Sequence, residues 1–385
     1  MASPAADISV IIPSCERTAL AMESVRSVLA QSRQVREIIV VANGDDDHAA
    51  FWQAEAGGII KVIREAVPGQ QAARTAGIEA AASTWVALLD DDDIYAPNFI
   101  ESVLPAIEDG RADIISTDHR KFWPERIDDK TNNESAPPGY WKGIRPERSA
   151  EWSFVGKFPL QLLLKRIPIY PSTTVVRRAF AIELGGFDRR MYGIRSEDIE
   201  FLIRALTYGK LSLVWLPLVY YRVHEGNLTR DRTAREIGKW RIFEFALANH
   251  PHLPEDFRLA LNRDLPRRRL EVARLAREVG DAELFKEVWS ILHPVYRTPA
   301  VHLLLTMGKR VARRLKVAKL WRSLHRGSQW TAKSPTSEWQ SDSRELGIPS
   351  VSDVIDSTGH QEISTKVSSR PIAARPAKAG RPGGP

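Results

Sequence analysis

Short apolar runs alternate with amphipathic segments of helical length through the first part of the chain. The pattern predicts strands at residues 8–12, 37–41, 61–63 and 85–89, and helices at residues 19–30 and 69–82. Within residues 19–30 the apolar side chains recur at the spacing of one helical face. Strands that alternate with helices predict an α/β fold with a doubly wound, mostly parallel sheet.

Polar side chains gather directly after three of these strands. They follow Ile12, Val41 and Leu89. Open parallel sheets bind their ligands beyond the carboxyl ends of the strands. We therefore expect the three polar clusters to meet at one edge of the sheet and to form a ligand site there.

The composition changes twice after the fourth strand. Residues 119–149 are polar and rich in Trp and Pro, and we expect a long loop there that covers a bound substrate. Regular structure then resumes up to about residue 229. Residues 231–326 look helical and basic, whereas residues 327–385 are rich in Ser, Pro and Gly and have too little apolar surface to fold. We predict a domain at 1–230, a basic helical extension at 231–326 and a disordered tail at 327–385.

The composition also narrows the cellular setting and the partners. Cys15 is the single cysteine, so no intrachain disulfide can form, which fits a reducing compartment. We find neither a signal peptide nor an apolar run of membrane-spanning length. We therefore expect a cytoplasmic protein, or one peripheral to the inner face of the cytoplasmic membrane. The net charge of +7 favours anionic partners, which include nucleotides, anionic lipids and nucleic acids.

Four consecutive aspartates, residues 90–93, follow the strand predicted at 85–89. Carboxylates this close repel one another unless water or a cation screens them. A divalent cation such as Mg²⁺ or Mn²⁺ that bridges to a diphosphate would relieve the repulsion. A solvated acidic turn is the alternative interpretation. The position at the predicted ligand edge favours the binding site.

Four further side chains each have a chemical and a structural interpretation. Glu197 and Asp198 open a predicted helix, where a carboxylate can accept a proton from a hydroxyl, or both can serve as an acidic helix cap. His224 lies just beyond an apolar strand and is either a metal ligand or a structural histidine. Arg74, in the helix predicted at 69–82, is either a clamp for a diphosphate or a surface charge.

In their order along the chain, these motifs resemble the family 2 glycosyltransferases, which have the GT-A fold. The resemblance extends over residues 8–229. Its motifs are residues 9–14, 37–44, 89–93, 185–188, 197–198 and 221–224, with Arg74 between the second and the third. Residues 89–93 are similar to the DxD signature of the family. Each motif is common on its own, but the complete series in this order is specific.

The resemblance implies an enzyme that moves a sugar from a nucleotide-diphosphate donor, with a UDP-sugar as working hypothesis, to a hydroxyl of a glycan or lipid-linked acceptor. It implies inversion at the anomeric carbon, with Asp198 as general base and Glu197 in support. Asp92 and His224 would hold Mn²⁺ or Mg²⁺, which stabilises the leaving diphosphate. The donor-binding residues that it implies are Pro13, Ser14, Cys15, Glu16, Asn43, Arg74, Asp90 and Asp91.

Three departures from the family pattern bear on the donor. Ala42 stands where the family usually has an acidic residue, and Glu16 stands where Asn is common. The run of four aspartates also allows the signature to shift by one residue. The chain lacks the Gln-x-x-Arg-Trp motif of processive synthases. We therefore expect the transfer of one or a few sugars, in polysaccharide biosynthesis at the cell envelope.

Three other functions compete with this interpretation. An inactive nucleotide-sugar-binding protein is favoured by Ala42 and opposed by the intact Asp and His positions. A nucleotidyltransferase would need a glycine-rich loop after the first strand, and residues 14–17 contain no glycine. A nucleic-acid-binding protein would use the basic helices of the C-terminal part. For residues 300–326 we favour an anionic membrane surface as partner, with packing on the catalytic domain as the remaining alternative.

Overall fold

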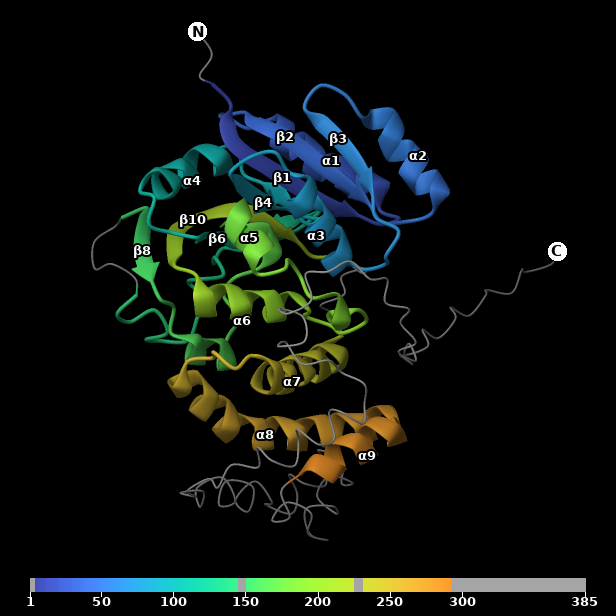
Figure 1. The fold of residues 1–385 in the computed structure, drawn as a ribbon, viewed down its shortest axis with the longest axis vertical. Helices are drawn as coiled ribbons and strands as arrows, with labels where there is room; N and C mark the ends of the chain where they lie inside the picture. Colours follow the sequence, from blue (N-terminus) through green and yellow to red (C-terminus); the bar gives the residue numbers. More distant parts are fainter. Residues whose placement is uncertain (1–3, 145–149, 225–230, 293–385) are drawn as a thin grey trace, which may run out of the picture. The chain divides into compact units, whose positions relative to one another are not determined.

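The computed structural model describes residues 4–144, 150–224 and 231–292, which form a mixed sheet covered by helices (Figure 1). The first part of the chain alternates strands and helices. Its elements are β1 (Ala6–Ser14), α1 (Thr18–Leu29), β2 (Val35–Ala42), α2 (Asp46–Glu55), β3 (Ile60–Arg64), α3 (Gln70–Ala80) and β4 (Trp85–Leu88). This alternation is the βα pattern expected of a parallel sheet.

The second part is less regular, with short strands and 3₁₀ turns between the longer elements. Up to the last strand it comprises β5 (Ile94–Tyr95), α4 (Phe99–Glu108), β6 (Ile114–Trp123), β7 (Arg126–Ile127), β8 (Trp152–Gly156), η1 (Leu160–Leu164), η2 (Pro171–Thr173), β9 (Thr174–Arg177), α5 (Arg178–Glu183), η3 (Arg189–Met191), α6 (Asp198–Tyr208) and β10 (Leu211–Arg222). The helices α7 (Arg232–Asn249), α8 (Glu255–Val279) and α9 (Ala282–Ile291) then follow.

The sheet has the strand order β3-β2-β1-β4-β9-β6-β10-β5, with β7 on β6 and β8 on β10. Strands β3, β2, β1 and β4 are parallel, and β6 is parallel to β10, whereas β9 runs antiparallel to both of its neighbours. In the register, Ile11 lies between Ile39 and Leu88. The carboxyl ends of β1, β2 and β4 therefore meet at one edge, as the sequence predicts.

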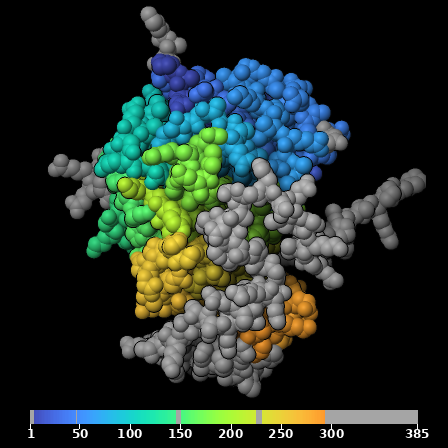
Figure 2. Space-filling view, in the orientation of Figure 1, coloured from blue at the N-terminus to red at the C-terminus, as the bar shows by residue number. Residues whose placement is uncertain are grey.

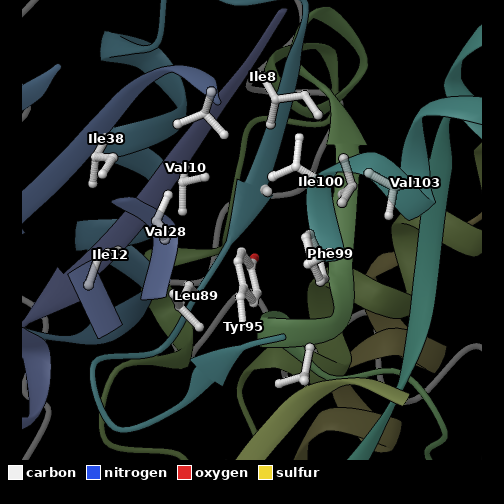
Figure 3. Packing of buried hydrophobic residues seen from close by; sticks show 14 of the residues in the cluster. Ile8, Val10, Ile12, Val28, Ile38, Leu89, Tyr95, Phe99, Ile100 and Val103 are labelled. Carbon is white, nitrogen blue, oxygen red and sulfur yellow. The ribbon is translucent and has the colours of Figure 1, made fainter. Parts of the chain in front are cut away.

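Alternate residues of β1 pack against helices on opposite faces of the sheet. Val10 and Ile12 join a buried cluster with α1 and α4, in which Phe99 stacks on Tyr95 with ring centroids 3.7 Å apart (Figure 3). On the other face α3 approaches closely, because a Cβ on Gly77 would lie only 2.3 Å from a methyl group of Ile11. Burial of each such side chain stabilises the fold by about 1.5–3 kcal/mol. The core thus fixes the strand ends that carry the polar clusters.

The helices α7, α8 and α9 pack in sequence, with α7 on α6 and α8 on η1. In Figure 2 the yellow atoms of this part of the chain lie directly against the green ones. A buried charge cluster joins α6 to the end of α7. The carboxylate of Glu200 binds Arg204 on its own helix at 2.6 Å and His250 at 3.0 Å. Arg269 of α8 in turn binds Glu244 of α7 at 2.6 Å. These contacts attach the described C-terminal helices to the part of the chain that carries the site.

The α/β fold, its mostly parallel sheet and the helical C-terminal part are confirmed. The sequence missed α2 and α4, and the loop expected from residue 119 is wrong at its start. Residues 119–123 continue β6, because they pair with the end of β10 and this pairing outweighs their polar character. No helix in the described part of the chain is long and apolar enough to span a bilayer. Residues 300–326 and 327–385 lie outside the described residues, and the predicted division into domains stays a prediction.

Candidate active site

The acidic run follows β4 and lies at the edge where β1 also ends. The Leu89 amide donates to the Ile11 carbonyl at 3.0 Å, and the Asp90 amide donates to the Ser172 hydroxyl at 3.1 Å. Ser172 belongs to η2, which leads into β9 on the other side of β4. The backbone of the run is therefore held from both neighbouring strands.

Arg74 of α3 links the acidic run to the start of α6. Its guanidinium donates to Asp90 at 2.7 Å, to Glu197 at 3.2 Å and to Gln70 at 2.8 Å. The residue is only 1% exposed. Burial by itself would lower the pKa of Arg74, but Asp90 and Glu197 raise it above its ordinary value. Arg74 is therefore a permanently charged bridge between two carboxylates that lie far apart in the sequence.

Arg17 is a second cation of the site, and sequence reasoning missed it. One of its terminal nitrogens, Nη1, donates to Asp92 Oδ2 at 2.7 Å, while Nη2 pairs with Asp91 Oδ1. Burial raises the pKa of Asp91 to about 7, although Arg17 lowers it in part. The sequence places Arg17 directly after the polar turn of β1, which is the signal that could have identified it.

Asp92 and His224 lie side by side, as expected of two ligands of one metal. His224 Nε2 is 3.1 Å from Asp92 Oδ2, and both side chains are partly exposed. Carboxylate oxygen and imidazole nitrogen are suitable donors for Mn²⁺, and the carboxylate also suits Mg²⁺. No group of three His, Cys, Asp or Glu is arranged for a metal among the described residues. Diphosphate oxygens and water would therefore have to complete the coordination.

Asp93 has a structural environment that differs from that of Asp92. Its carboxylate accepts hydrogen bonds from the Ser172 hydroxyl at 2.6 Å and from the Arg222 amide at 3.0 Å, and its carbonyl accepts one from Ser24 at 2.7 Å. Burial raises the pKa of Asp93 well above its ordinary value. Asp93 thus joins β4, η2 and β10 rather than facing a ligand.

The turn after β1 is supported by α2, which the sequence analysis did not predict. The Ser14 hydroxyl accepts a hydrogen bond from the Trp52 indole at 3.0 Å, and the Ser14 carbonyl lies 2.9 Å from His48 Nε2. The Cys15 amide points to Asp91 Oδ2 at 3.4 Å. Both α2 side chains are buried, so Ser14 forms part of the frame of the site.

The positions of Pro13 and Glu16 in this turn follow from their backbone conformation. Pro13 pairs with Val41 inside the sheet. Glu16 has a φ of 56°, in the left-handed region that a non-glycine residue rarely adopts. The strain of such a residue is common at ligand sites. Glu16 turns the chain from β1 towards α1, and Arg17 is the last residue before that helix.

Asn43, predicted to contact the base of the donor, uses its side chain to hold a loop. Its amide nitrogen donates to the carbonyls of Glu65 and Val67, each at 2.7 Å, and its amide oxygen accepts from the Gly69 amide at 2.9 Å. The loop between β3 and α3 is therefore tied to the end of β2. The side chain of Asn43 therefore fixes the position of this loop at the edge of the sheet.

Asp198 is the first residue of α6, directly after Glu197. Burial and then the negative charge of Glu197 raise the pKa of Asp198 to about 7. No side chain in the described part of the chain donates a hydrogen bond to its carboxylate. A carboxylate with this pKa and without a fixed partner can accept a proton near neutral pH.

His119, from the segment expected to form a loop at 119–149, belongs to an aromatic cluster with Tyr170 and Tyr221. The His119 ring packs against Tyr170 with centroids 4.9 Å apart and an interplanar angle of 85°, and it lies 5.6 Å from Tyr221. Burial lowers the pKa of His119 to about 3, so the ring is neutral. Burial raises the pKa of Tyr170, and the charge of Asp198 contributes to this increase. Through Tyr170, this aromatic cluster lies close enough to Asp198 to feel its charge.

Comparison with known proteins gives a consistent result. Residues 9–181 match the family model described as glycosyl transferase family 2. An uncharacterized glycosyltransferase of a Nostoc species is 27% identical over 228 residues, which cover 57% of this chain and 66% of that protein. One of Rickettsia conorii is 33% identical over 117 residues, which cover 30% and 19% of the two chains. The chain thus matches less than two thirds of the length of these two relatives.

A crystal structure of Staphylococcus aureus TarS in complex with UDP-GlcNAc has a similar fold. The TM-score is 0.52 at 15% sequence identity, and the match covers 77% of this chain and 86% of that one. The family model and the fold thus point to the same kind of protein, and the match to the model is confined to residues 9–181. Over residues 9–181 the chain is similar to glycosyl transferase family 2, and it has the GT-A fold.

Proposed function

We propose that this enzyme transfers a sugar from a nucleotide-diphosphate donor to an acceptor hydroxyl of a glycan or lipid-linked substrate, with inversion at the anomeric carbon. The observation that carries the proposal is the pair of unlike acidic clusters joined by Arg74. Within the run at 90–93, arginines balance Asp90, Asp91 and Asp92, whereas Asp198 has no side-chain partner in the described structure. The first suits an anionic donor and the second a proton acceptor.

On the donor side, Asp92 and His224 would hold Mn²⁺ or Mg²⁺, which supplies positive charge to the leaving diphosphate. The turn at 13–16 and the loop tied by Asn43 border the same strand ends and would receive the nucleoside. A UDP-sugar is the first donor to test, because the similar TarS structure holds UDP-GlcNAc. Arg74 keeps Asp90 in position and connects it to Glu197, which directly precedes α6.

On the acceptor side, Asp198 would take the proton of the acceptor hydroxyl while that oxygen attacks the anomeric carbon. The bond from the anomeric carbon to the diphosphate oxygen breaks on the opposite face of the sugar, so the configuration inverts. Glu197 is held by Arg74 at 3.2 Å and therefore acts as a positioning residue. Its negative charge also helps to raise the pKa of Asp198 into the range in which general bases work.

Calorimetric titration of UDP, GDP and dTDP, each with and without Mn²⁺, tests the donor side. We expect one nucleotide to bind the wild type in a metal-dependent manner. Asp92→Ala should lower that affinity by about a hundredfold, since the loss of a ligand costs at least as much as the loss of a residue that supports one. Asp129→Ala is the matched control, because Asp129 is exposed and lies beyond β7.

Two outcomes of this titration would count against the proposal. If none of the three nucleotides binds the folded wild type under either condition, the metal-dependent transferase is refuted. If a nucleotide binds equally well without Mn²⁺ and to Asp92→Ala, the donor is recognised but the assignment of Asp92 to the metal is wrong.

A further inference from the structure

The guanidinium of Arg17 spans two neighbouring carboxylates of the acidic run. Nη1 lies 2.7 Å from Asp92 Oδ2, and Nη2 pairs with Asp91 Oδ1. Arg17 is 28% exposed at its side chain, whereas Asp91 is 2% exposed. The cation therefore lies on the solvent side of a buried carboxylate, at the start of α1.

The same oxygen of Asp92 also receives His224, at 3.1 Å from Nε2. The pair proposed to hold the metal is thus already in contact with a positive charge. A divalent cation bound to Asp92 would lie close to the guanidinium of Arg17, and the two positive charges would repel each other. A divalent cation that binds Asp92 Oδ2 therefore competes with Arg17 for this oxygen.

Arg74 cannot respond in this way. It is 1% exposed, and three side-chain acceptors hold its guanidinium. Arg17 has two carboxylate partners and a partly exposed, flexible side chain. If Arg17 keeps Asp91 and releases Asp92, its Nη1 becomes available on the solvent side of the run. The nearest new anion there would be the diphosphate of the donor, which matches the fork geometry of arginine.

We propose that Arg17 is the resident counter-cation of Asp92, which a divalent cation displaces and which then contacts the donor diphosphate while it pivots on Asp91. This inference rests on the proposed function. In this proposal, Arg17 links the binding of the divalent cation to the binding of the donor diphosphate. The metal alone must compete with Arg17, but the metal together with a diphosphate gives Arg17 a replacement partner. Metal and nucleotide therefore bind with positive coupling, and the coupling is reciprocal.

The proposal predicts opposite changes in two affinities of one variant. In Arg17→Gln, Mn²⁺ alone should bind about tenfold tighter, because the competing charge is gone. UDP in the presence of saturating Mn²⁺ should bind about tenfold more weakly, because a charge-assisted contact is lost. A merely structural role for Arg17 would weaken both affinities. Both are measured by calorimetry on the full chain.

Arg26→Gln is the matched control, because Arg26 is exposed on the same helix. Its two affinities should equal those of the wild type. Arg17→Lys is a second variant for the case that Arg17→Gln does not fold by circular dichroism. Its ammonium keeps the charge but reaches one carboxylate at a time, so Mn²⁺ alone should bind about threefold tighter than to the wild type.

The inference is overturned if a folded Arg17 variant binds Mn²⁺ alone no tighter than the wild type does. It is also overturned if both affinities fall together. Failure of the proposed function is a separate outcome. In that case UDP, GDP and dTDP all fail to bind the wild type, while the comparison with Mn²⁺ alone still decides whether Arg17 competes for Asp92.

Discussion

The two acidic clusters of the site differ in how their charges are balanced. In the run at 90–93 every carboxylate has a partner: Arg74 for Asp90, Arg17 for Asp91 and Asp92, and the Ser172 hydroxyl for Asp93. In the pair at 197–198, Glu197 shares Arg74, but Asp198 receives no side-chain donor in the described part of the chain.

This difference suits the two tasks that we propose for the site. A carboxylate held by a cation keeps its position, which suits the binding of a charged donor, although burial still raises the pKa of Asp91 to about 7. Burial raises the pKa of Asp198 as well, and the absence of a side-chain donor in the described structure leaves its carboxylate ready to take a proton. Arg74 touches both clusters, so it sets the boundary between them. Three experiments can break or sharpen this contrast.

The largest effect is expected for Asp198→Asn, which removes the proposed proton acceptor and keeps the shape of the side chain. We expect kcat to fall about a thousandfold, within the range of general-base catalysis. The affinity for the nucleotide should stay within about twofold, because the donor cluster does not change. Release of nucleotide product in the presence of an acceptor measures the rate, and calorimetry measures the affinity.

Glu197→Gln is the companion variant, because it alters the neighbouring carboxylate and leaves Asp198 in place. Its kcat should fall about tenfold, as expected for a residue that positions and tunes another. Equal losses in the two variants would contradict the division of roles. A folded Asp198→Asn protein that keeps wild-type kcat would exclude Asp198 as the base.

The next effect concerns stability. Arg74→Met keeps much of the side-chain volume but leaves Asp90 and Glu197 without their shared, buried cation. We expect the free energy of unfolding to fall by about 3 kcal/mol, which is typical when one partner of a buried ion pair is removed. Urea unfolding followed by circular dichroism measures this. In Arg74→Met combined with Glu197→Gln, part of the loss should return, because one uncompensated charge is gone.

A double variant as unstable as the sum of the two single variants would show that the two carboxylates are independent. The boundary between the clusters would then not depend on Arg74.

Local patterns in the sequence were enough to predict the first four strands and the edge where their polar ends meet. Burial of alternate apolar residues, as in β1, dictates these elements without help from distant parts of the chain. The acidic run could be placed at that edge for the same reason. The sequence also placed Asp198 at the start of a helix, because the glycines before it mark a turn.

The partners of these residues could not be predicted, because they depend on contacts across the fold. Arg17 reaches Asp92 from 75 positions away, and Ser172 reaches Asp93 from 79 positions away. The support of Ser14 by α2 has no local signal either. Residues 119–123 look like a loop in isolation and become a strand only because β10 lies beside them. Tertiary context thus decides which carboxylates are neutralised.

The smallest effect is the pH dependence of the reaction, and it tests the unpartnered state of Asp198 directly. Burial and the charge of Glu197 raise the pKa of Asp198 to about 7. The carboxylate is protonated below that pKa and cannot accept a proton, so kcat/KM should fall about tenfold for each pH unit below about 7. In Glu197→Gln the charge that raises the pKa is absent, so the fall should begin at a lower pH. Asp91 has a pKa raised to about the same value, and Asp91→Asn is therefore the control.

If the fall in kcat/KM at low pH persists in Asp91→Asn and shifts in Glu197→Gln, it reports the titration of Asp198. If the fall disappears in Asp91→Asn, the titrating group belongs to the run at 90–93, and the two acidic clusters do not differ in the way that we propose.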